Sequence, residues 1–148
     1  MDLNELRKMS QSADSELATK IKSSVDISGF ASELMNKLNA EAKTQAQRGQ
    51  RKASITLDVY DYHVQQEITR ICRTPAKGIL VNLFKSKDCN WTEMTKYAEA
   101  FVSLLKNEIN DKNIHFELND DSRTCEIDRD GDISCTNKWW NLKATVSW

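Results

Sequence analysis

The aromatic residues of this 148-residue chain are concentrated in its later part, and this uneven distribution limits where a core can form. Ten of the eleven lie at or beyond Tyr60, and only Phe30 comes earlier. Because large rings bury the most apolar area per residue, the chain after about Ala53 should build the main core. Ser, Lys, Glu, Asn and Gln are frequent in the first fifty residues. The sequence therefore predicts a polar helical N-terminal arm over residues 1–50 and a core domain over residues 51–148.

Two helices are predicted within the arm. The first is indicated by two apolar pairs, Leu3 with Leu6 and Leu17 with Ile21. We expect the polar stretch at residues 10–15 to interrupt it. The second follows from apolar residues that recur every four positions, which are Phe30, Leu34, Leu38 and Ala42. Ser28 is its expected N-cap, and Gly49 suits the position just past its end.

Between residues 54 and 84 the sequence predicts one strand followed by short helices. Apolar and polar residues alternate over residues 54–59, as in a half-buried strand. Asp61 is expected to cap a helix. The apolar face of that helix would consist of Val64, Ile68, Ile71 and Cys72. Thr74 and Pro75 suit the N-cap and the first position of another helix. Residues 79–84 fit either a short helix or a buried strand, and we favour the helix.

The strongest helical pattern covers residues 91–109. Its wide apolar stripe consists of Met94, Tyr97, Ala98, Phe101, Val102, Leu105 and Ile109. At its start Asn90 and Glu93 resemble a capping box, in which the side chains of the N-cap residue and of a residue three positions later satisfy the first amides. This segment is therefore the predicted helical partner of the sheet.

Beyond Asn113 the apolar period changes to two, which is typical of strands. The first strand would carry Ile114, Phe116 and Leu118 on one face. A three-residue loop at 129–131 would close a hairpin, with Ile127 facing Ile133 and Cys125 opposite Cys135. The last strand would carry Trp140, Leu142, Ala144, Val146 and Trp148 on one face and Trp139, Lys143, Thr145 and Ser147 on the other. The predicted fold class is α+β, with an antiparallel sheet of about four to five strands packed against helices.

Charge and hydropathy exclude several classes of protein. The chain has 21 basic and 22 acidic residues, so its net charge of −1 argues against a strongly basic nucleic-acid coat. No run approaches the roughly 18 apolar residues of a membrane helix, and the N-terminus lacks the apolar segment of a secretion signal. We therefore expect no membrane partner, and a cytoplasmic protein that is not secreted.

Candidate metal sites are weak in this sequence. Residues 126–133 resemble part of an EF-hand calcium loop, but Asn137 occupies the position that requires a bidentate Glu, so we favour an ordinary hairpin turn. The cysteines, Cys72, Cys89, Cys125 and Cys135, lack the paired short spacing of zinc ligands. Cys125 and Cys135 could form a disulfide, although reduced thiols are favoured. We expect no metal and no cofactor.

Catalytic signatures are also lacking. His63 and His115 are the only imidazoles, and the alternation around His115 directs it away from the core. No nucleophile elbow, zinc-protease motif or phosphate-binding loop is present. We predict that the protein is not an enzyme, with an enzyme that has a dispersed site as an alternative.

Two surfaces are predicted to bind partners. Trp139 shares its strand face with Lys143, and exposed tryptophan often anchors protein interfaces. Arg48, Arg51 and Lys52 form part of a basic segment over residues 43–52, which would serve the alternative function of nucleic-acid binding through phosphate contacts. We expect a protein partner or a homo-oligomer, because short isolated helices such as those of the arm are marginal in water.

Two segments resemble small α+β proteins of large double-stranded DNA viruses. They are residues 30–59, a polar helix followed by the sequence from Gly49 to Leu57, and residues 141–148, the strand that ends at Trp148. The resemblance implies a minor structural component of a virus particle or a host-directed viral protein, so a virion-associated location is the alternative to a cytoplasmic one. It transfers no catalytic residue. The leading hypothesis is therefore a non-enzymatic interaction or assembly protein.

Overall fold

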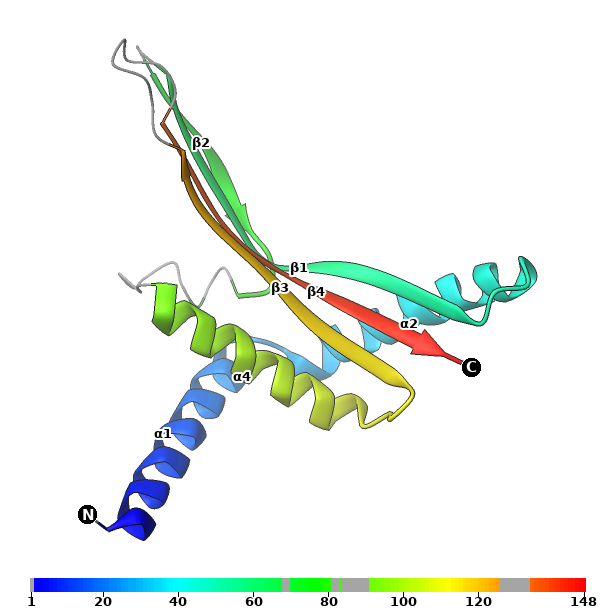
Figure 1. The fold of residues 1–148 in the computed structure, drawn as a ribbon, viewed down its shortest axis with the longest axis horizontal. Helices are drawn as coiled ribbons and strands as arrows, with labels where there is room; N and C mark the ends of the chain where they lie inside the picture. The colour runs from blue at the N-terminus through cyan, green and yellow to red at the C-terminus, as the bar shows by residue number, and fades with distance from the viewer. Residues whose placement is uncertain (1, 68–69, 81–82, 84–90, 126–133) are drawn as a thin grey trace.

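The computed structural model describes residues 2–67, 70–80, 83, 91–125 and 134–148. Its helices are α1 (Leu3–Ser24), α2 (Ile27–Gln47) and α4 (Trp91–Ile109). Its strands are β1 (Lys52–Glu67), β2 (Arg70–Lys77), β3 (Ile114–Cys125) and β4 (Ser134–Ser147). In Figure 1 these helices lie against one half of a long twisted sheet, whose other half extends beyond them. The predictions of an α+β class and of N-terminal helices are confirmed.

The sheet is antiparallel, with strand order β2-β1-β4-β3. The central strands β1 and β4 pair from Lys52 and Ser147 to Gln66 and Ser134. β2 pairs with β1 only over the outer segment that begins at Asp61. The outer half of the sheet therefore has four strands, and the half next to the helices has three rather than the four to five expected.

The helices predicted after Asp61 and at Thr74 are wrong, because both segments belong to β-strands. The apolar spacing of residues 61–77 is ambiguous between helix and strand. The outcome is decided by cross-strand pairing, of β1 with β4 and of β2 with β1. Pro75 is tolerated because β2 is an edge strand, where a missing N–H need not interrupt a ladder. Only part of the segment 79–84 is described, so its prediction as a helix falls largely outside the described residues.

The N-terminal helices differ from expectation in two details. α1 is continuous through the serine-rich stretch 10–15, where every side chain is exposed, so those residues cost only helix propensity. The N-cap of α2 is Asp26, whose Oδ1 accepts a hydrogen bond of 3.0 Å from the Gly29 N–H. Ser28 instead donates to Glu108 of α4. The predicted end of α2 near Gly49 is confirmed, since α2 ends at Gln47 and Gly49 has a φ of +79°.

The N-cap assignment is testable with two neighbouring substitutions. Asp26→Ala removes the side-chain acceptor at the start of α2 and should lower the free energy of unfolding by about 1 kcal/mol. Ser28→Ala removes only an exposed hydrogen bond to Glu108 and should cost less. Urea denaturation followed by circular dichroism measures both. A larger loss for Ser28→Ala would contradict the assignment.

One core joins the arm helices to the later part of the chain. Its fully buried members come from most of the described elements, and include Ile21, Leu34, Leu38, Val59, Phe101, Leu105, Trp140 and Leu142. The ring centroids of Phe30 and Phe101 lie 5.3 Å apart in an edge-on arrangement that ties α2 to α4. The C-terminal part of α1 and one face of α2 thus pack with the later chain, while the domain boundary at residue 50 stays a prediction.

A register shift in β1 changes which side chains face the helices. The pairing of β1 with β4 shifts between Asp58 and Tyr60, and both Val59 and Tyr60 are buried. The Val59 carbonyl accepts a hydrogen bond of 3.0 Å from the Leu80 N–H. Gly78, with a φ of +119°, lies directly against this part of the β1 backbone. The irregularity therefore lets the chain after β2 fold back onto the sheet.

Candidate interaction surface

The predicted basic residues lie at the connection between α2 and β1. Arg48 is the C-cap of α2, Lys52 begins β1, and Arg51 lies between them; all three are exposed. The N–H of Trp148 donates to the Arg51 carbonyl at 3.0 Å, so the described end of the chain lies beside them. The structure therefore brings these three cations together at one end of the sheet.

Trp139 and Lys143 lie on the sheet face that the helices leave open. Lys143 is exposed between Thr56 on β1 and Glu117 on β3. Trp139 is partly buried and pairs with Asp61. Because β4 rises about 3.3 Å per residue, Trp139 lies roughly 26 Å along the strand from its end. The five predicted site residues thus form separate surfaces rather than one site.

The open face of the sheet is polar in its described part. Ser54 and Thr145 share a hydrogen bond of 2.8 Å between their hydroxyl oxygens. His115 and Glu117 are exposed, which confirms the prediction that His115 points away from the core. On the covered face, Trp140, Leu142 and Ala144 are buried as predicted. The sheet is thus buried on one side and hydrophilic on the other.

Sequence reasoning missed the largest exposed apolar feature of the described residues, which is the N-terminal half of α1. Leu3, Leu6 and Met9 are 59%, 45% and 63% exposed. At 100° per residue they share a helix face with Leu17 and Ile21, and Ile21 is fully buried. Figure 1 shows this half of α1 projecting away from the sheet. The face that enters the core at one end of α1 therefore continues uncovered to the other; we call Leu3, Leu6 and Met9 the apolar stripe.

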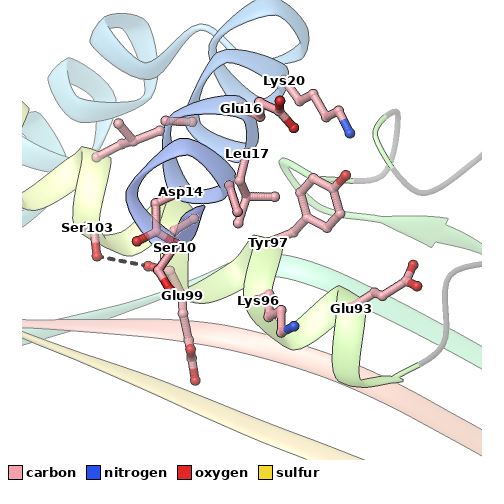
Figure 2. A pocket seen from close by; sticks show the side chains of 14 residues that line it. Ser10, Asp14, Glu16, Leu17, Lys20, Glu93, Lys96, Tyr97, Glu99 and Ser103 are labelled. Carbon is pink, nitrogen blue, oxygen red and sulfur yellow. Dashed lines mark hydrogen bonds between the residues drawn. The ribbon is translucent and has the colours of Figure 1, made fainter. Parts of the chain in front are cut away.

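A groove of about 930 Å³ lies between α1 and α4, next to the apolar stripe. Figure 2 shows Leu17 of α1 and Tyr97 of α4 among its lining residues, with Asp14, Glu16, Glu93 and Glu99 around them. Ala13, Ala100 and Leu104 add apolar surface, while Lys20 and Lys96 are the basic lining residues. A shallow depression lined by Leu3, Leu6 and Arg7 continues along α1 and shares Ser10 and Asp14 with the groove. An apolar lining with charged residues around it suits an amphipathic helix.

The described residues were also compared with the requirements of a metal site and of a membrane-spanning helix. Within the described ranges, no group of three His, Cys, Asp or Glu residues is arranged to hold a metal ion. None of the described helices combines the length and apolarity needed to cross a bilayer. The candidate calcium loop at 126–133, with Ile127 and Ile133, and the capping residue Asn90 fall outside the described residues.

The predicted register of the hairpin around that loop is confirmed. Cys125 of β3 pairs with Cys135 of β4 at the end of their ladder. The oxidation state of this pair stays a prediction, with reduced thiols favoured.

Comparison of the chain with protein-family models, with curated proteins and with solved structures found no match. The resemblance to viral proteins and the absence of catalysis thus stay predictions. The assignment of a function depends on the surface of the molecule alone.

Proposed function

We propose that this chain is a non-enzymatic protein–protein interaction or assembly protein, and that the N-terminal half of α1 is its binding element. The observation that supports the proposal is the apolar stripe, in which three large side chains are each about half exposed or more. Single exposed apolar residues are normal, but a contiguous row beside a groove is typical of an interaction site. Every residue from 2 to 16 is exposed, so this half of α1 is held only by its attachment to the buried half.

Burial of the stripe would provide the driving force for association. Removal of apolar surface from water yields about 25 cal/mol per Å², and leucine and methionine side chains contribute most of the apolar area on this face. The charged residues that flank the stripe, among them Glu5 and Arg7, would remain at the edge of the contact. This arrangement of an apolar centre and a polar rim is that of ordinary protein interfaces.

Two groups remain predicted secondary contacts. They are Trp139 with Lys143, and the basic cluster of Arg48, Arg51 and Lys52. Their exposure or partial exposure permits binding, but neither group lies next to a groove among the pockets described. Nucleic-acid binding by the cluster would weaken steeply as salt rises, which distinguishes it from apolar docking by α1.

Site-specific photo-crosslinking tests the proposed function. A photoreactive amino acid in place of Met9 should form a covalent adduct with another polypeptide when the full chain is irradiated in an extract of its native source. The same group in place of Ser15, on the opposite face of α1, is the matched control and should form little or none. Gel electrophoresis and mass spectrometry measure the adducts.

Equal labelling from both positions would show that the apolar stripe has no special role, and the absence of adducts from Met9 would overturn the proposal. Substitution of both Leu3 and Leu6 by Glu should abolish the adduct from Met9. Far-UV circular dichroism should be nearly unchanged in that variant, because both residues lie outside the core.

A further inference from the structure

The seam of α1 has the residue spacing of a paired helix. Leu3, Leu6, Ser10, Ala13 and Leu17 are separated alternately by three and four residues, which places them in one line facing a partner helix. Leu3 and Leu6 are 59% and 45% exposed, and Ser10, Ala13 and Leu17 line the groove with α4. We propose, building on the proposed function, that α1 binds antiparallel to α1 of a second copy of this chain within this groove.

An antiparallel register makes the seam complementary to itself. When Leu6 lies opposite Leu17 of the second copy, Ser10 lies opposite its Ala13. The small side chains at the centre allow the helix axes to approach to about 8 Å. Each contact occurs twice, around a two-fold axis perpendicular to the helices, as a symmetric dimer requires. The methylene stem of Lys20 then covers Leu3 of the second copy while its ammonium stays in water.

Charge distribution along one edge of the seam favours a second copy over a foreign helix. Arg7 and Asp14 are seven residues apart on the same edge and both line the depression on α1. In the antiparallel register, Arg7 lies beside Asp14 of the second copy, so two ion pairs form across the two-fold axis. A parallel pair would instead place this edge of one helix beside the opposite edge of the other, so Arg7 and Asp14 would not meet. The complement of each charge is thus present within α1 itself.

The groove extends this contact beyond a single helix pair. Tyr97, Ala100 and Leu104 of α4 line the groove into which the incoming α1 would insert. Its acidic lining residues, Glu93 and Glu99 among them, would lie near the path of the incoming Arg7. Since specific interfaces bury at least about 1,000 Å², participation of α4 supplies area that the α1 pair alone lacks.

The mass of the purified full chain in solution tests this proposal. Sedimentation velocity should give twice the chain mass of 17.0 kDa for the wild type at micromolar concentration. Leu6→Glu should give the monomer mass with unchanged helix content, because Leu6 is 45% exposed and lies outside the core. Ser15→Glu, on the opposite face of α1, is the matched control and should remain a dimer.

A charge exchange tests the register. Arg7→Asp and Asp14→Arg should each raise the Kd of the homodimer by about tenfold, because both ion pairs become like-charge pairs. An equimolar mixture of the two variants should regain the wild-type Kd as a heterodimer, in which both pairs again join opposite charges. Native mass spectrometry distinguishes the heterodimer if one variant carries a mass tag.

Three outcomes would overturn the proposal. If the wild type stays at the monomer mass up to millimolar concentration, a second copy is not the partner. An adduct from position 9 with a different polypeptide would then still support the proposed function. A dimer that survives Leu6→Glu, or a mixture that does not regain affinity, shows that the copies associate through another surface.

Discussion

Replacement of Trp140 by alanine is expected to lower the free energy of unfolding by about 3–5 kcal/mol. The Trp140 side chain is 1% exposed, the largest of the fully buried side chains. Its ring lies 5.9 Å from that of Tyr60, between centroids, across the β1–β4 pair. Loss of the indole would leave a cavity beneath the helices, and the rigid sheet cannot close it. Urea denaturation monitored by far-UV circular dichroism measures the change.

The adjacent Trp139 provides a matched control. It lies on the opposite, polar face of β4 and is only partly buried, so Trp139→Ala should cost about 1 kcal/mol. Two neighbouring tryptophans on one strand should thus differ severalfold in their contribution to stability. Similar losses for both variants would mean that the open face of the sheet is covered in solution.

Gly78→Ala is expected to have the second large effect, a loss of about 3 kcal/mol or more in the free energy of unfolding. A Cβ atom at this position would lie 2.5 Å from the Val59 carbonyl oxygen and 2.8 Å from the Tyr60 nitrogen. Both are backbone atoms of β1, which cannot rotate away as a side chain would. The φ of +119° adds strain for any residue other than glycine.

Gly49→Ala separates the cost of the clash with the β1 backbone from the cost of the positive φ. Gly49 also has a positive φ, +79°, but a Cβ atom there would meet nothing within 4 Å. Its substitution should therefore cost only the backbone strain, about 1 kcal/mol. Thermal or urea denaturation of both variants gives the comparison, and equal losses would mean that the β1 backbone near Val59 moves to accommodate the methyl group.

Much of the fold follows from local periodicity. The stripe from Met94 to Ile109 identified α4 with its correct bounds, and alternation identified the covered faces of β3 and β4. The β1–β2 hairpin could not be predicted in the same way. Its residues 61–77 have a spacing compatible with a helix. The β1 part is a strand because it pairs with β4, about 70 positions away, and β2 in turn pairs with β1.

The candidate interaction surface was less accessible to prediction. Composition identified Arg48, Arg51, Lys52, Trp139 and Lys143, but it could not show that they lie on separate surfaces. Leu3 and Leu6 were recognised as part of a helix face, and an apolar helix face is by default assigned to a core. In the structure α4 contacts α1 near Leu17 and leaves the first turns of α1 uncovered. Only this arrangement shows that Leu3 and Leu6 remain in water.

The uneven anchoring of α1 also determines how tightly any partner can be held. Its first turns are stabilised by intrinsic helix propensity and by the N-cap residue Asp2. The Asp2 Oδ1 accepts a hydrogen bond of 2.9 Å from the Asn4 N–H. Such a segment exchanges between helix and coil faster than the packed turns around Ile21. Binding must therefore select the helical fraction, and the measured affinity falls in proportion to that fraction. Residues on the solvent side of α1 thereby tune affinity without touching the partner.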